Sequence, residues 1–165
     1  MANDATDRLL TGWDEARPDL EVGVLQVTAR LSRLGAHLAR RQEDVFGRFD
    51  LNRGEVGALS ALRIAGSPHR LSPTRLAKGL MLSSAGITSR IDRLERRGYV
   101  RRLDDPNDRR GVLIELTDEG LEVVDAAVAA NTTSERTLLD RLDPDEIASL
   151  EGILRKLLAG LELPD

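Results

Sequence analysis

The sequence contains no cysteine, and its only aromatic residues are one tryptophan, one tyrosine and two phenylalanines. Without cysteine the chain has no disulfides and no thiol-based redox sensing, and the usual structural zinc sites are disfavoured. His37 and His69 lie far apart in the sequence, without the spacing of metal ligands, so we expect no metal. The chain also lacks dinucleotide-binding, phosphate-binding, zinc-protease and serine-hydrolase motifs, so we expect neither an enzyme nor a cofactor.

The sequence also has no basic-then-apolar leader at its start and no apolar run near the ~20 residues of a membrane span. We therefore expect a cytoplasmic protein without a membrane partner. Its 165 residues are 41% hydrophobic and 32% charged, which is typical of a globular chain with a core. The scarcity of aromatic residues and the abundance of Leu, Ala and Arg favour helices.

Charge is unevenly distributed along the chain. The formal net charge is −4. Residues 63–113 nevertheless hold 12 Lys/Arg against 5 Asp/Glu, a net +7, which leaves −11 for the rest. Such a basic segment is either a solvated face or a surface for nucleic acid.

Apolar periodicity predicts helices at both ends of the chain. A short helix up to Pro18 precedes a long one from about Asp19 to Arg48, and a further helix follows from about Arg53 to Ala65. After about residue 117, with Thr117 as cap, one helix runs to about Leu142, and Asp143 caps the last. Two of these helices each have a narrow line of apolar residues along one side, which is typical of helix-to-helix contact and is called a seam below. The two seams comprise Val24, Val27, Leu31, Leu34 and Leu38, and Ile147, Leu150, Leu154, Leu157 and Leu161.

The basic middle has a different pattern. Ser72 is a predicted N-cap with Pro73 in the first helical position, and Ser83 caps a second short helix that ends at Gly98. The runs YVRRL and GVLIEL then predict two strands joined by a long, exposed tip, DDPNDRR. This order is that of a helix-turn-helix followed by a wing.

In a helix-turn-helix the second helix enters the major groove of DNA. We predict that the DNA contacts come from the start of the first helix, the exposed face of the second helix and the wing tip. They are Pro73, Thr74, Ser83, Ser84, Thr88, Ser89, Arg90, Arg93, Arg109 and Arg110. Hydroxyl groups bond phosphates or base edges, and arginine fits guanine or a narrow minor groove. A solvated hairpin tip remains the alternative for Arg109 and Arg110.

The stretch from LSPTRLAKGL to GVLIELTDEG, with its DRR wing at Asp108–Arg110, resembles the MarR family of winged-helix transcriptional regulators. The match is strong over residues 51–121. The resemblance implies that the terminal helices of two subunits interlock as a dimer. It also implies that Asp108 orients Arg110 for the minor groove, with Arg109 beside it.

The stretch WDEARPDLE is similar to the urate-responsive branch of that family. This narrower resemblance implies a ligand site with Trp13, Arg90 and Arg102. The branch has an aspartate where this sequence has Gly57, so another small aromatic or phenolic ligand is the broader expectation. Simple packing is the alternative role for Trp13.

Together these features predict a mainly α fold with a winged helix-turn-helix lobe, a two-stranded wing and a helical dimerisation region. The expected domains are 1–50 and 118–165 for dimerisation and 51–117 for DNA binding. The expected function is that of a homodimeric repressor, which binds an inverted-repeat double-stranded DNA operator and is relieved by a small ligand. A winged helix used only for protein contacts, without specific DNA binding or ligand response, is the alternative.

Overall fold

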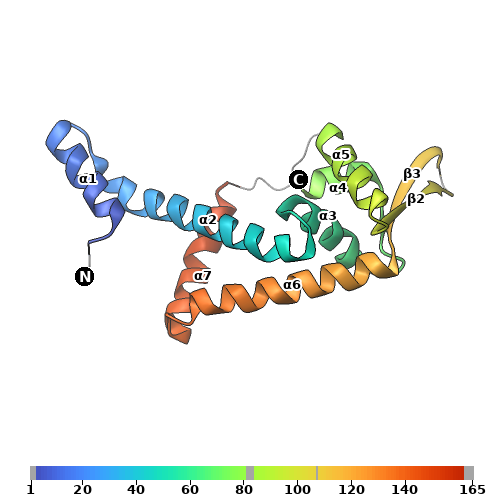
Figure 1. The fold of residues 1–165 in the computed structure, drawn as a ribbon. Helices are drawn as coiled ribbons and strands as arrows, with labels where there is room; N and C mark the ends of the chain where they lie inside the picture. The colour runs from blue at the N-terminus through green and yellow to red at the C-terminus, as the bar shows by residue number, and fades with distance from the viewer. Residues whose placement is uncertain (1–2, 81–83, 107, 162–165) are drawn as a thin grey trace. The chain divides into compact units, whose positions relative to one another are not determined.

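The computed structural model describes residues 3–80, 84–106 and 108–161. Within these ranges the chain is mainly helical, with one small antiparallel sheet (Figure 1). The α-helices are α1 Ala5–Ala16, α2 Leu25–Phe46, α3 Arg53–Ile64, α4 Pro73–Gly79, α5 Ser84–Arg96, α6 Asp118–Leu139 and α7 Pro144–Ala159. The strands are β1 Arg70–Leu71, β2 Val100–Asp105 and β3 Asp108–Leu116. The chain divides into two compact units, Met1–Arg53 and Gly54–Asp165.

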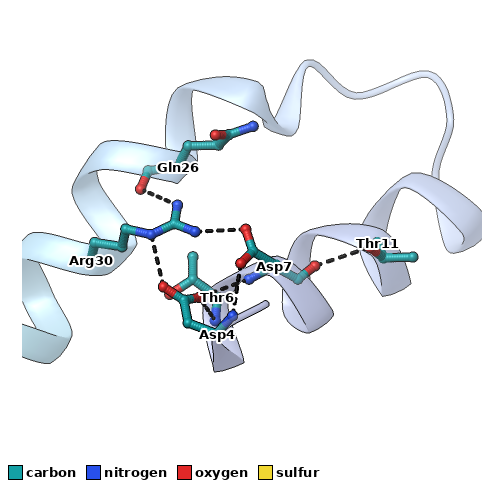
Figure 2. A network of polar contacts seen from close by, with 6 residues as sticks. All are labelled: Asp4, Thr6, Asp7, Thr11, Gln26 and Arg30. Atoms are coloured by element: carbon teal, nitrogen blue, oxygen red, sulfur yellow. Dashed lines mark hydrogen bonds and ion pairs between the residues drawn. The ribbon is translucent and has the colours of Figure 1, made fainter. Parts of the chain in front are cut away.

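In the first unit, α1 lies against the start of α2. The Asp4 carboxylate caps α1 by accepting the backbone N–H of Thr6 at 2.6 Å and of Asp7 at 3.0 Å. Arg30 of α2 reaches between the two acids, 2.9 Å from Asp4 and 2.6 Å from Asp7 (Figure 2). One arginine therefore fastens the capped end of α1 to α2, while Leu10 is buried.

The long helix of the first unit begins later than the sequence predicts. Its expected start was about Asp19, but a 3-10 turn at Val22–Val24 comes first and α2 begins at Leu25. The Arg17 side chain holds the Asp19 carboxylate at 2.7 and 2.5 Å across Pro18. This local pair ties the chain into a turn where apolar periodicity alone indicated helix.

In the second unit, helices α3 to α5 enclose the core with the sheet. Glycines end two of these elements as predicted, since Gly66 and Gly98 both have φ near +76°. The apolar side chains of this core are at most 2% exposed. They include Leu59, Leu62, Leu76, Ile87, Ile91, Leu94, Val100 and Ile114.

The sheet has three strands in the order β1-β3-β2, although the sequence predicts only two. The additional strand is two residues long, with Arg70 opposite Glu115 and Leu71 opposite Ile114. The ladder also reaches into the predicted tip: pairing of β2 with β3 is regular to Asp104 opposite Val112, then shifts register before Asp105 opposite Asp108. The ladder of the wing is therefore longer than predicted, and its register is irregular between Asp104 and Asp105.

Helix α6 follows the hairpin directly (Figure 1). The Thr117 hydroxyl accepts the backbone N–H of Gly120 at 3.0 Å, as the predicted cap requires. The segment NTTSE is an expected weak point, yet the helix is continuous there. Thr132 and Thr133 donate their hydroxyls to carbonyls one turn earlier, at 2.9 and 3.1 Å.

Helix α7 begins with the predicted capping box of Asp143 and Glu146. None of its side chains is buried within the described residues. In its apolar seam Leu157 is 48% exposed, and Ile147, Leu150 and Leu154 are partly exposed. Its apolar seam is therefore left open by the chain itself.

Candidate nucleic-acid interface

Helices α4 and α5 form the predicted helix-turn-helix lobe. The Ser72 hydroxyl caps α4 by accepting the Arg75 backbone N–H at 3.3 Å, and Leu76 is fully buried beneath. Pro73 is half-buried in the first turn of α4 and Thr74 is exposed there. The start of α4 therefore offers polar groups to solvent, as a phosphate contact needs.

Helix α5 has one apolar and one polar face. Ile87 and Ile91 are 1% and 2% exposed, which fixes the buried face. Thr88 and Ser89 are exposed on the other side, as predicted. Ser83 lies outside the described residues, and so does the side chain of Ser84.

Arg93 of α5 and Arg97, which directly follows α5, contact the first turn of α3. Glu55 there is only 4% exposed. Arg93 donates to its carboxylate at 2.9 Å, and Arg97 lies 4.0 Å from it. Arg93, predicted as a DNA contact, thus also orients α5 against α3.

The predicted wing contacts lie at the start of β3. Asp108 is exposed at the start of β3, and Arg109 and Arg110 follow it in the strand. A Cβ on Gly111 would lie 2.9 Å from the Cβ of Asp105, so this position of β3 requires glycine. The side chains of the two arginines lie outside the described residues, and the Asp108–Arg110 pair stays a prediction.

A buried carboxylate holds the base of the wing together. Glu115 of β3 is 6% exposed and pairs with Arg70 of β1 and with Arg101 of β2. Burial on its own would raise the pKa of the Glu115 carboxyl, but the hydrogen bonds and charges of Arg70 and Arg101 hold it below its ordinary value of 4.5. One side chain therefore links all three strands.

Replacing Glu115 with glutamine is expected to lower the free energy of unfolding by about 1 kcal/mol at neutral pH, because the charge-assisted bonds are lost while Arg101 stays largely solvated. Since the pKa is depressed on folding, this stabilisation is present above the unfolded pKa near 4.5 and is lost as pH falls through the folded value. Urea unfolding of wild type and variant from pH 7 downward measures it. A difference that stays constant over that range would contradict the pairing, and Glu122→Gln on the exposed face of α6 is the control.

Arg102, a predicted ligand residue, is already engaged. It lies 2.5 Å from Asp92 and also pairs with Glu95, so it joins β2 to α5. An anionic ligand would have to compete with these two carboxylates. Trp13, 44% exposed on α1, belongs to the first unit, whereas Arg90 and Arg102 belong to the second.

Carboxylates also reduce the positive charge that the basic segment presents. At least six of its twelve cations have a carboxylate partner within the described residues. They are Arg63, Arg70, Arg93, Arg97, Arg101 and Arg102. Three of the partner acids, Glu55, Glu115 and Asp125, lie outside residues 63–113. The cations left for phosphates are therefore at most about six per lobe, fewer than composition alone indicates.

Sequence reasoning missed Glu55 and Glu115. Each acid is paired with an arginine on another element, 38 residues away for Arg93 and 45 for Arg70. The only local signal is Glu115 itself, an acid within the apolar run VLIEL. The strand pattern does not indicate which residue would pair with it.

Comparison with known proteins identifies the family. A profile of the MarR family matches residues 49–111. The transcriptional regulator PecS of Dickeya dadantii is 35% identical over 88% of this chain and 87% of its own length. The chain belongs to the MarR family. Its members are transcriptional regulators rather than enzymes, and this MarR-family chain is a DNA-binding regulator with a winged-helix fold.

Two solved MarR-family structures with DNA have the same fold. Sco3205 of Streptomyces coelicolor in complex with DNA is 29% identical, with a TM-score of 0.77 over 87% of this chain and 94% of that one. A mutant of Escherichia coli MarR complexed with operator DNA is 28% identical, with a TM-score of 0.69 over 88% of this chain and 97% of that one. In the part of this chain that the structure describes, no helix has the length and apolarity to cross a bilayer.

Proposed function

We propose that this regulator acts in the cytoplasm as a homodimeric repressor on an inverted-repeat operator. The observation that carries the proposal is the combination of an exposed polar face on α5 with apolar seams that the chain leaves uncovered. Two recognition helices in successive major grooves require half-sites about 10 bp apart. The solved complexes of Sco3205 and of E. coli MarR with DNA support this use of the fold.

The dimer is inferred from exposed apolar surface. Val24, just before α2, is 70% exposed, and Val27 of α2 is 60% exposed; Leu161, just after α7, is 80% exposed. Contiguous apolar surface of this kind usually marks a protein interface. A second copy of the chain would cover both seams and bring two lobes to one operator.

The operator contacts proposed are the polar side chains of α4, α5 and the wing named from the sequence. Thr74, Thr88 and Ser89 are supported by their exposure. Within the wing, Asp108 would orient Arg110 toward the minor groove, with Arg109 on the adjacent backbone. The support within the wing is the close approach of Asp105 and Asp108 to Gly111, which leaves no room for a side chain next to the two arginines.

A small aromatic or phenolic effector is proposed to relieve repression. Trp13 offers a ring face, and Arg90 and Arg102 offer cations for an anionic group. The support within the second unit is the bridge of Arg102 to Asp92 and Glu95, since a ligand that draws Arg102 away releases α5. A preference of a few kcal/mol between two arrangements is enough for such a switch.

Replacement of Arg110 with alanine is expected to weaken operator binding by about tenfold, because one minor-groove contact per lobe is lost. A mobility shift with the promoter DNA that flanks the protein's own gene measures this. The matched control is Arg141→Ala, which removes an exposed arginine outside residues 51–117. Unchanged affinity of the Arg110 variant would contradict the role of the wing.

The same assay tests the effector. Urate and simple phenolic acids are titrated into the bound sample, and release of DNA at sub-millimolar concentrations is the expected result for one of them. A protein that shifts no promoter fragment specifically would favour the alternative, a winged helix used for protein contacts.

A further inference from the structure

Arg90 of α5 differs from Arg93 and from Arg97, the residue that directly follows the helix. Arg90, Arg93 and Arg97 recur at steps of three and four, and all three face the first turn of α3. Arg93 and Arg97 end on the carboxylate of Glu55. Arg90 has no carboxylate partner among the described residues and ends instead on Gly54.

The contact between Arg90 and Gly54 is steric. A Cβ built on Gly54 would lie 2.5 Å from Nε, 2.6 Å from Cζ and 2.7 Å from Nη2 of Arg90. All three atoms belong to the guanidinium plane, so this plane lies against the main chain of Gly54. Real Cβ contacts do not come this close, and any other residue type at position 54 displaces the guanidinium by roughly 1 Å.

The position is also electrostatically unusual for an arginine. The first turn of a helix carries partial positive charge, which does not attract a cation. Arg90 is therefore held there by packing, while Glu55 in the next position fixes α5 through Arg93. A guanidinium has five N–H donors, and those of Arg90 remain available for an acceptor that approaches α5.

We propose that Gly54 is a specificity-determining position of this regulator, because its missing side chain sets the place from which the Arg90 guanidinium reads a guanine of the operator. The O6 and N7 atoms of guanine in the major groove fit the fork of an arginine. Good hydrogen bonds have donor–acceptor distances of 2.7–3.2 Å, so a displacement of the guanidinium by roughly 1 Å is larger than this whole range allows. The proposal rests on operator binding as proposed above.

The test is a double-mutant cycle with Gly54→Ala, Arg90→Ala and both together. The readout is the preference for guanine at each operator position, from a binding selection on randomised half-sites. Arg90→Ala is expected to lower the guanine preference at one position per half-site by about 5- to 150-fold. Gly54→Ala is expected to lower the same preference by at least about threefold, and to change it less than twofold in the Arg90→Ala background.

Two controls separate reading from folding. Gly47→Ala adds the same methyl group in open space and should leave the preference unchanged. Arg90→Lys keeps the charge but loses the fork, so it should lose the guanine preference while binding random DNA as before. This variant tests the reading arginine even if Gly54→Ala lowers the melting temperature.

Two results would overturn the proposal: an unaltered preference in Gly54→Ala, or losses from Gly54→Ala and Arg90→Ala that multiply in the double variant. A wild-type protein that selects no sequence at all would instead overturn operator binding itself, and the proposal with it.

Discussion

Replacing Gly120 with alanine is expected to destabilise the second unit by about 3 kcal/mol, a loss of roughly 6–12 °C in melting temperature. Gly120 is buried in the first turn of α6, next to Tyr99 and Leu116. A Cβ there would overlap the carbonyl oxygen of Tyr99 and lie 2.9 Å from the carbonyl carbon. These atoms are main chain, so no side-chain rotation relieves the overlap.

The same carbonyl oxygen of Tyr99 accepts the backbone N–H of Thr117 at 3.1 Å. Moving it away breaks a hydrogen bond at the base of the wing. Thermal unfolding followed by circular dichroism measures the effect, with Gly12→Ala as control, since that glycine of α1 has nothing within 4 Å of an added Cβ. The control should be neutral or slightly stabilised, because alanine favours helix. Equal melting temperatures for the two variants would contradict the close approach at Gly120.

Replacing Leu157 with glutamate is expected to convert the protein from dimer to monomer and to lower operator affinity by about 100-fold or more. Leu157 lies in the apolar seam of α7 and is 48% exposed in the single chain. A carboxylate buried in an apolar interface without a partner costs several kcal/mol. A monomer places one lobe at a time on DNA, so the gain from binding two half-sites together is lost.

Sedimentation or light scattering gives the mass, which should be twice 18.1 kDa for wild type and 18.1 kDa for the variant. The matched control is Ser149→Glu, which adds the same charge at an exposed polar position of α7 and should remain dimeric. Deletion of residues 143–165 should have the same effect as Leu157→Glu. A dimeric Leu157 variant with full operator affinity would contradict α7 as the dimer surface.

The helix boundaries that the sequence predicts well are those with local causes. Ser72, Thr117 and Asp143 cap α4, α6 and α7 through hydrogen bonds to residues three positions on. Gly98 ends α5 through its own backbone geometry. Because each signal lies within one turn of the chain, it is visible without knowledge of the fold.

Features that depend on distant partners could not be predicted. The two-residue strand β1 exists only because β3 lies beside it. The hairpin extends past its predicted end because Gly111 lets Asp105 and Asp108 approach each other. Apolar periodicity predicts the start of α2 too early, because the Arg17–Asp19 pair across Pro18 holds this segment in a turn.

The same distinction between local causes and distant partners applies to the candidate site. The polar positions Thr88 and Ser89 were predictable from the period of α5 alone. The partners of Arg93 and Arg102 were not, since Glu55 is 38 residues from Arg93 and since Asp92 reaches Arg102 across two elements. A charge count along the sequence therefore overstates the cations that face DNA.

Sequence-specific binding of a DNA operator is most directly tested by operator affinity as a function of salt, compared with random DNA of equal length. We predict that the operator is preferred by about 1000-fold or more at physiological salt. We also predict that affinity falls steeply as salt rises, with a slope set by at most about six phosphate contacts per lobe. Equal affinity for operator and random DNA, or an affinity that does not change with salt, would contradict the account.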